Sequence, residues 1–242
     1  MAVLYSPGII TDGLVLALDA ANPKSYPGSG TLWRDLSGHG NNCTLYNNPS
    51  YSFKSGGCLN FSTNQYGTIT SPAGFNFDNN FTVSVWFSPF STLTGANDVR
   101  QSLYSGNVAS AFGLEIGNFT NGCAANGLGT DGRRFLIHRQ GSCFANISNT
   151  FQFSQNQQLN FSYTRNSSRS GKLYVNGVEI ASINDETSFV FSTPTNVDIC
   201  RRANPTTQYF NGDFYSMNVY NRSLTPQEIL QNYIATKSRY GL

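Results

Sequence analysis

Short runs of alternating hydrophobic and polar residues fill most of the chain. The clearest run lies at residues 81–90, "FTVSVWFSPF", where Phe81, Val83 and Val85 face one side. Ser84 and Trp86 lie between them and face the other side. A period of two residues is typical of a β-strand with one face in a hydrophobic core. Trp86 indicates that the second face of this strand is also partly covered.

Two other patterns predict local backbone geometry. Asn176 and Gly177 separate two alternating runs in "KLYVNGVEIAS", which predicts a two-residue hairpin with a type I′ turn. Near Ser216 the alternation slips, because Phe214 and Met217 are both hydrophobic but lie an odd number of residues apart. One β-bulge at this point would restore the alternation.

The last part of the chain carries the signals of a single helix. Thr225 can serve as its N-cap, Pro226 suits the first helical position, and Glu228 completes a capping box. Leu224 and Ile229 occupy the two positions of a hydrophobic staple. The apolar stripe predicted to pack on the rest of the protein consists of Ile229, Leu230, Tyr233 and Ile234.

The order of these elements predicts the fold class. About a dozen short strands without intervening helices indicate an all-β, antiparallel β-sandwich of the jelly-roll type, closed by one C-terminal helix. No linker-like segment or internal repeat divides the chain, so we expect a single domain over residues 1–242. In such a sandwich the first and last strands can pair, and a final helix can cover an exposed edge or end.

Composition excludes several classes of protein. Charged residues make up 12% of the chain, about half the usual share, and the net charge is +2. The basic residues are scattered, so we expect no nucleic acid partner. No apolar run approaches the roughly 20 residues that span a bilayer, and the first residues lack the features of a signal peptide. We therefore expect no membrane insertion, and a route other than classical secretion if the protein works outside a cell.

The five cysteines do not form a metal-binding pattern, because none has the spacing of zinc ligands. Cys43 and Cys58 flank one turn-rich segment, and Cys123 and Cys143 flank another. Either pair could form a disulfide across neighbouring strands. Buried free thiols are the simpler interpretation, and the spacing alone leaves both open.

Several blocks of sequence together carry a resemblance to a known family. They are "GLVLALDAANPKSYPGSGTLWRDLSGHGNN", "LNFSTNQYGTI" leading to "FTVSVWF", "LYVNG", and "FNGDFYSMNVYNRSLTPQEILQNY". The chain resembles the laminin-G-like branch of the concanavalin A-like lectin/glucanase superfamily, and most of all the laminin-G-like structural proteins of tailed bacteriophages. The resemblance implies a concanavalin A-like jelly roll and a role in extracellular recognition or in a virus particle.

Departures from the family pattern refine these expectations. Laminin-G calcium sites use an aspartate near the segment that corresponds to "SAFGLEI", where this chain has Ser110 and Ala111. These residues argue against a calcium site, so we expect no metal and no cofactor, with calcium as the one alternative that the resemblance leaves open. Cys43 and Cys58 stand where relatives carry small residues, which makes Cys43–Cys58 the leading candidate disulfide. It would form after release from the reducing cytosol.

The superfamily includes glucanases, and a catalytic pair of acidic residues would mark such an enzyme. A retaining glycosidase needs two carboxyl groups about 5–5.5 Å apart. The chain has only four glutamates, and no strand carries two of them. His39 and His138 come without a nucleophile motif such as G-x-S-x-G. We therefore expect that the protein is not an enzyme.

Two non-enzymatic functions are left. The first is a structural protein of a bacteriophage virion, as a capsid decoration or tail fibre component. It would be made in the host cytoplasm, displayed on the particle, bound to other virion proteins and homo-oligomeric. The alternative is an adhesin that attaches a particle or cell to surface glycans.

Candidate ligand-binding residues lie in two polar loops, "STLTGANDVR" and "NGCAANGLGTDGRR". They are Asp98, Arg100, Asp131 and Arg133. Trp33, Trp86 and Phe87 have the pattern of core residues rather than of an exposed sugar platform.

Overall fold

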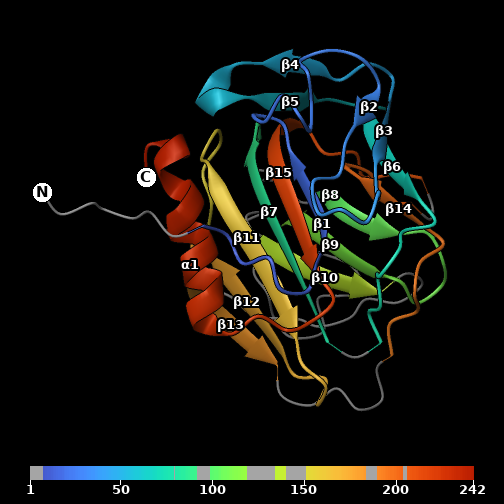
Figure 1. Ribbon diagram of the computed structural model, residues 1–242, viewed down its shortest axis with the longest axis vertical. Helices are drawn as coiled ribbons and strands as arrows, with labels where there is room; N and C mark the ends of the chain where they lie inside the picture. Colours follow the sequence, from blue (N-terminus) through green and yellow to red (C-terminus); the bar gives the residue numbers. More distant parts are fainter. Residues whose placement is uncertain are drawn as a thin grey trace, which may run out of the picture.

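The computed structural model describes residues 8–78, 80–91, 99–118, 134–139, 151–183, 190–203 and 206–242. Two antiparallel sheets stack face to face, and one helix lies along the outside of one of them (Figure 1). The sheet under the helix, here called the helix-side sheet, contains β1 (Leu14–Asp19), β4 (Ser50–Ser52), β5 (Cys58–Phe61), β7 (Phe81–Pro89), β11 (Leu159–Arg165), β12 (Gly171–Val175), β13 (Val178–Ile183) and β15 (Gly212–Tyr220). Its order is β13-β12-β11-β7-β15-β5-β4, with β1 paired to β15.

The second sheet, here called the opposite sheet, has seven strands in the described residues. They are β2 (Leu32–Trp33), β3 (Cys43–Tyr46), β6 (Tyr66–Thr70), β8 (Val99–Gly106), β9 (Phe112–Asn118), β10 (Arg134–Arg139) and β14 (Asn196–Ile199). Their order is β10-β9-β8-β14-β6-β3-β2. In the same described residues, the helical elements are α1 (Pro226–Lys237) and two short 3₁₀ turns, η1 (Lys54–Gly56) and η2 (Ser238–Tyr240). The predicted all-β sandwich with one C-terminal helix is confirmed.

The core lies between the two sheets and follows the alternation of the sequence. On β7, Phe81, Val83, Val85 and Phe87 are fully buried and belong to the main hydrophobic cluster. Trp86 belongs to a different cluster on the outer face of the same sheet. The prediction that this strand has two covered faces is therefore confirmed, and all nine residues of β7 are buried.

The first and last strands pair as expected. β1 runs antiparallel to β15, with Leu18 opposite Met217 and Asp19 opposite Ser216. The register between β15 and β7 shifts between Phe214 and Ser216, which is the predicted bulge. Because of this shift, Phe214 and Met217 both reach the core.

The predicted hairpin joins β12 and β13. Asn176 and Gly177 have φ values of 52° and 77°, as a type I′ turn requires of both central residues. Strand pairing continues directly on either side, with Val175 opposite Val178. This hairpin is confirmed at the edge of the helix-side sheet.

The start of α1 has the predicted capping box. Thr225 Oγ1 accepts a hydrogen bond from the Glu228 amide (3.3 Å), and Glu228 Oε2 accepts one from the Thr225 amide (2.8 Å). Pro226 occupies the first turn. The two staple residues, Leu224 and Ile229, are buried in one hydrophobic cluster.

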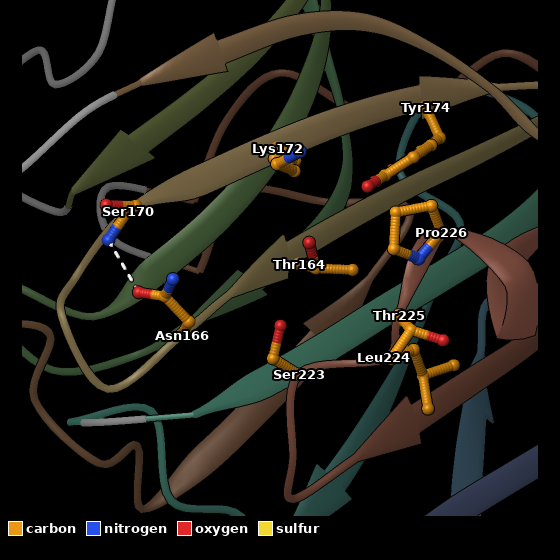
Figure 2. Close-up of a pocket in the computed structure, with 9 residues that line it drawn as sticks. All are labelled: Thr164, Asn166, Ser170, Lys172, Tyr174, Ser223, Leu224, Thr225 and Pro226. Carbon is orange, nitrogen blue, oxygen red and sulfur yellow. Dashed lines mark hydrogen bonds between the residues drawn. The ribbon is translucent and has the colours of Figure 1, made fainter.

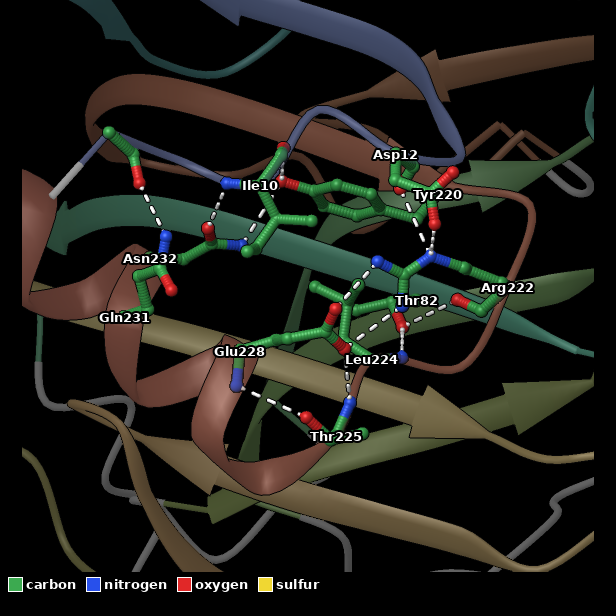
Figure 3. Close-up of polar contacts among 11 residues, drawn as sticks. Ile10, Asp12, Thr82, Tyr220, Arg222, Leu224, Thr225, Glu228, Gln231 and Asn232 are labelled. Carbon is green, nitrogen blue, oxygen red and sulfur yellow. Dashed lines mark hydrogen bonds and ion pairs between the residues drawn. The ribbon is translucent and has the colours of Figure 1, made fainter.

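Arg222 fastens this end of the helix to the sheet (Figure 3). Its guanidinium donates to Glu228 at 2.9 and 2.7 Å and contacts the Asp12 carboxylate at 2.8 Å. Thr82 on β7 donates to the Arg222 carbonyl and accepts from the Leu224 amide, both at 2.9 Å. The loop before α1 is therefore held by the sheet through hydrogen bonds as well as by its own cap.

The position of α1 differs from the sequence-based expectation. The helix covers the outer face of the helix-side sheet rather than its edge or end (Figure 1). Trp86 from the sheet stacks on Tyr240 (ring centroids 4.0 Å) and on Tyr233 (5.7 Å), and its Nε1 donates to Thr236 Oγ1 (3.0 Å). A wide sheet with two apolar faces needs cover on both, and the helix provides it on one side.

The predicted apolar stripe of α1 is only partly correct. Ile229 is buried, but Leu230 and Ile234 are 43% and 41% exposed. Asn232 is buried instead, because its amide accepts from the Ile10 amide (2.8 Å) and donates to Tyr220 Oη (3.1 Å). These bonds join the N-terminal segment to the helix and rotate the buried face away from the residues that hydrophobicity alone selects (Figure 3).

The predicted disulfide between Cys43 and Cys58 is wrong for this structure, where both cysteines are free and buried. Cys43 lies in the core between the sheets, whereas Cys58 lies on the outer face of the helix-side sheet beside Trp86 and Tyr240. A β-sheet therefore separates the two thiols, and no rotamer can join them. Burial raises the pKa of Cys58 to about 12, so this thiol stays protonated. Cys123 and Cys143 lie outside the described residues.

Within the described ranges, no helix combines the length and the apolar character needed to cross a membrane.

The ion pair at the start of α1 makes stability depend on pH. Hydrogen bonds from Arg222 lower the pKa of Glu228 from 4.5 to about 2. Because the folded pKa is the lower one, the stabilisation is present above about pH 4.5 and is lost as the pH falls toward 2. We expect Glu228→Gln to reduce the free energy of unfolding by about 1 kcal/mol at pH 6, and the difference from the native protein to shrink between pH 4.5 and 2. Urea titrations over this pH range would measure it, and a difference independent of pH would contradict the assignment.

Candidate functional site

The most exposed aromatic residue among the described residues lies beside an edge strand. Phe53 follows β4, and 83% of its surface is accessible. Tyr51, two residues earlier, packs against it with the rings 5.1 Å apart and nearly perpendicular. Tyr26, from the loop after β1, packs against Tyr51 at 5.7 Å. Three aromatic rings from two segments thus pack in a row, with Tyr26 buried, Tyr51 partly buried and Phe53 exposed.

These rings line a pocket of about 230 Å³, here called the aromatic pocket. Its lining residues are Ala21, Pro23, Tyr26, Pro27, Gly28, Tyr51, Phe53 and Gly56. None of them is charged. Tyr26 Oη donates to the Gly30 carbonyl (2.9 Å), and burial together with Tyr51 raises the pKa of Tyr26, so its phenol stays neutral. The pocket offers apolar ring faces with neutral polar groups beside them, which suits an uncharged ligand.

Close backbone packing fixes the shape of this pocket. Gly57 has φ 147°, and a Cβ at this position would lie 2.7 Å from Ala21 Cα. Glycine therefore lets the β4–β5 hairpin approach the loop after β1. Lys54, directly after Phe53, forms an ion pair with the buried Asp213 (2.6 Å). This bond ties the η1 turn to β15 and holds the backbone that carries Phe53.

Two carboxylates on the outer face of the opposite sheet, Glu115 and Asp198, are the residues to compare with a catalytic pair. Glu115 on β9 is fully buried and lies 3.4 Å from the Arg100 guanidinium. With its amide oriented to suit its neighbours, Gln208 donates to Glu115 (2.9 Å) and accepts from Arg100 (3.0 Å). Glu115 is therefore enclosed among hydrogen-bond donors.

Asp198, the next carboxylate on this face, is held elsewhere. It lies on β14, two strands away from β9, so the Cα atoms of Glu115 and Asp198 are more than roughly 9 Å apart. Asp198 accepts from Arg201 Nε (2.9 Å) and from Thr68 (2.8 Å), which lies on the side away from Glu115. The retaining arrangement needs about 5–5.5 Å between carboxyl groups, which these tethered side chains do not approach.

The same face carries a second group of stacked planar side chains. The ring of Tyr66 lies parallel to that of Tyr46 at 4.7 Å, and the Arg201 guanidinium lies 3.4 Å from the Tyr66 centroid. Tyr46 is half-exposed, but it lies flat on its neighbour. It therefore offers a smaller free surface than Phe53.

The ligand residues proposed from the sequence are only partly described. Arg100 lies on β8, where 13% of its side chain is exposed and its guanidinium contacts Glu115. Asp98, Asp131 and Arg133 lie outside the described residues. Ligand binding by these four residues stays a prediction.

The expectation about the large aromatics is confirmed, since Trp33, Trp86 and Phe87 are buried. Sequence reasoning missed Tyr51 and Phe53. Their signal in the sequence was a pair of aromatic residues spaced by two in the polar stretch "YSFKSGG". A buried strand would continue with hydrophobic residues after this pair, whereas here turn-forming residues follow.

No group of three or more histidine, cysteine, aspartate or glutamate side chains that could hold a metal ion occurs in the part of the chain that the structure describes.

A comparison with protein families identifies the superfamily of this chain. A family profile described as the Concanavalin A-like lectin/glucanases superfamily matches residues 61–230, most of the chain. The chain belongs to this superfamily. The match includes β7 and β15, which lie at the centre of the helix-side sheet, and the start of α1. No curated protein sequence matched the chain.

Several solved structures share the fold at low sequence identity. Domain 4 of a GH43 extracellular arabinanase from Geobacillus stearothermophilus, solved in complex with arabinotriose, is 15% identical, with a TM-score of 0.67 over 91% of this chain and 98% of that domain. The binding domain of botulinum neurotoxin serotype D/C is 12% identical, with a TM-score of 0.65 over 92% of this chain and 52% of that one. A Trypanosoma rangeli sialidase mutant is 15% identical, with a TM-score of 0.60 over 96% and 34%.

The chain thus matches the arabinanase domain over nearly the whole length of that domain and spans about half of the neurotoxin binding domain. At these identities the likeness establishes the fold alone.

Proposed function

We propose that this protein is a non-catalytic carbohydrate-binding protein that holds an uncharged glycan in the aromatic pocket. The observation that carries the proposal is the exposure of Phe53, 83% accessible at the rim of a pocket walled by two more aromatic rings. Burying a phenyl ring is worth about 1.5–3 kcal/mol, so a ring left in water at a built pocket favours a partner that covers it.

The chemistry of the lining supports a sugar as this partner. The C–H face of a sugar ring is apolar and flat, and it can lie on Phe53 while its hydroxyls contact the phenols and backbone groups beside it. No charged side chain lines the pocket, which favours neutral glycans over acidic ones. The arabinanase domain of the same fold was solved with arabinotriose, a neutral oligosaccharide, which supports the same ligand class.

The arrangement of the acidic residues supports binding without catalysis. Glu115 is enclosed by Arg100 and Gln208, and Asp198 is held two strands away. We expect that neutral polysaccharides bound by the protein are recovered uncleaved, with no new reducing ends. Turnover that disappears in the Glu115→Gln variant would overturn the non-catalytic assignment.

The decisive test is the removal of the exposed ring. We expect Phe53→Ala to weaken binding of a neutral polysaccharide by at least tenfold, equivalent to about 1.4 kcal/mol, with the melting temperature unchanged. Affinity gel electrophoresis with arabinan, xylan, glucan and mannan would measure it. Tyr46→Ala is the matched control, because it removes an exposed aromatic ring from the opposite sheet. Loss of binding in Tyr46→Ala, but not in Phe53→Ala, would overturn the assignment of the pocket.

We also propose, from the sequence resemblance, that this binding protein is displayed on a bacteriophage virion. Its low-charge exterior, with 12% charged residues, suits a displayed surface. The test is separate from the glycan test: the protein should be present at a fixed number of copies in purified particles. Its absence from particles would leave the alternative, an adhesin on another surface.

A further inference from the structure

A pocket of about 370 Å³ lies beside the last turns of α1, between the helix, the N-terminal segment and the outer face of β1 and β15. It is here called the Arg239 pocket. Asn218 and Ala17 line it from the sheet, Ala235 and Arg239 from the end of the helix, and Leu36 from the loop after β2. Its volume lies within the range of about 300–1,000 Å³ that is typical of ligand sites.

Small side chains leave this space open. Asn218 on β15 is directly opposite Ala17 on β1, and residues opposite each other in an antiparallel pair point to the same face of the sheet. Ala235 lines the pocket from the helix. Because both alanines carry only a methyl group, the helix and the sheet do not fill the space between them. A larger side chain at either position would occupy the pocket.

The polar groups in this pocket suit a neutral ligand with several hydroxyls. The half-buried side chain of Asn218 makes no hydrogen bond with the described residues, so its amide can both donate to and accept from a ligand. Asp19 and Arg239 form a partly exposed ion pair (2.8 Å). They are the only charged residues in the lining, so the charges of the pocket cancel. The pair places an acceptor beside donors, which matches adjacent hydroxyls of a sugar.

The Arg239 pocket adjoins the aromatic pocket. Asn22 lines the Arg239 pocket, and its chain neighbours Ala21 and Pro23 line the aromatic pocket. Consecutive Cα atoms are about 3.8 Å apart, so the two linings meet along the loop after β1. Gly56 lines the aromatic pocket, and a Cβ there would lie 3.6 Å from both Ala21 Cβ and Arg239 Cγ. The two pockets therefore lie on either side of a boundary about one residue wide.

We propose that the glycan held in the aromatic pocket is an oligosaccharide that crosses this boundary and also occupies the Arg239 pocket. This inference rests on the proposed function, because it names the length of the ligand bound at that site. One part of the chain packs on Phe53, and another reaches the Asn218 amide and the Asp19–Arg239 pair. Neither lining carries a net charge, so the oligosaccharide is neutral along its length.

The test compares short and long ligands built from the same sugar. Disaccharides and hexasaccharides of the arabinan, xylan, glucan and mannan series are titrated into the native protein by calorimetry. In the series that binds, we expect the hexasaccharide to bind about tenfold more tightly than the disaccharide, because only the longer chain reaches both pockets. The hexasaccharide, but not the disaccharide, should also shift the NMR amide signals of residues 216–218 and 235–239.

Two variants test the Arg239 pocket separately. Asn218→Ala should weaken hexasaccharide binding about fivefold, the effect of one lost hydrogen bond. Ala235→Leu fills the pocket with a residue that also favours a helix, and it should lower the hexasaccharide affinity to near that of the disaccharide. Asn211→Ala is the matched control, since Asn211 directly precedes β15 and lines neither pocket. It should leave hexasaccharide binding unchanged.

The outcomes separate this inference from the proposed function. Equal affinities for the two chain lengths, or hexasaccharide binding that resists both Asn218→Ala and Ala235→Leu, would show that the ligand ends within the aromatic pocket. Loss of binding in Phe53→Ala would then still support the proposed function. Tighter binding of an acidic hexasaccharide, such as a galacturonan fragment, would overturn the neutral assignment. If no glycan of either length binds, both proposals fail.

Discussion

Replacing Trp86 with alanine is expected to lower the free energy of unfolding by about 4 kcal/mol. The indole is 4% exposed and lies between the sheet and the C-terminal helix. It stacks on Tyr240 and Tyr233, and its Nε1 donates to Thr236 Oγ1. Truncation removes these contacts together and leaves a cavity at the centre of the interface, so the helix should detach more readily than the sandwich unfolds.

Urea denaturation followed by circular dichroism would measure this loss of free energy. In a thermal denaturation experiment, the same loss should appear as a fall of roughly 10 °C in melting temperature. Hydrogen exchange at the α1 amides would locate it. Trp86→Phe is the control, because it retains an aromatic ring and should recover about half of the loss. A change below about 1 kcal/mol in Trp86→Ala would mean that the helix contributes little to the stability of the sheet.

Lys54→Met should have the next largest effect, a loss of about 2–3 kcal/mol together with weaker glycan binding. Asp213 is 1% exposed, and its carboxylate accepts from Lys54 (2.6 Å), Asn60 and Tyr215 (3.3 Å). Removing the lysine leaves a buried negative charge without its cation. Lys54 is the first residue of η1 and directly follows Phe53. We therefore expect the backbone around the aromatic pocket to become more mobile at the same time.

The chain offers a close control for this variant. Lys172 has the same exposed fraction as Lys54, 44%, but its partner Glu179 is 37% exposed rather than buried. Lys172→Met should therefore change the free energy of unfolding by less than about 1 kcal/mol. Equal losses in the two variants, measured by urea denaturation, would show that the burial of Asp213 has no bearing on the strength of the pair.

Much of the fold could be predicted because its signals are local. The alternation of residues 81–90, the Asn176-Gly177 turn and the Thr225–Glu228 capping box each depend on neighbours in the sequence, and all three occur as expected. The bulge near Ser216 was predictable for the same reason, since a break in a period of two has only a few structural solutions.

The candidate sites were much less predictable. Phe53 and Tyr51 carry no motif, and their role depends on Tyr26, which comes from a loop far away in the sequence. Another pocket, beside the start of α1, likewise joins β11 and β12 with the loop before the helix (Figure 2). Binding surfaces of this kind arise where separate segments meet, so a pattern in one segment cannot reveal them.

The sequence by itself determined that this chain folds into strands with covered faces, turns at fixed positions and one capped helix, because these follow from periodicity and backbone preference. Only the tertiary structure decided that the helix covers the face of a sheet and that Asn232 rather than Leu230 lies on the buried side of this helix. It also decided that a sheet separates Cys43 from Cys58. The physical reason is that burial and hydrogen bonding depend on which distant segments come together. A side chain's environment is therefore set by packing, while its secondary structure is set largely by its neighbours in sequence.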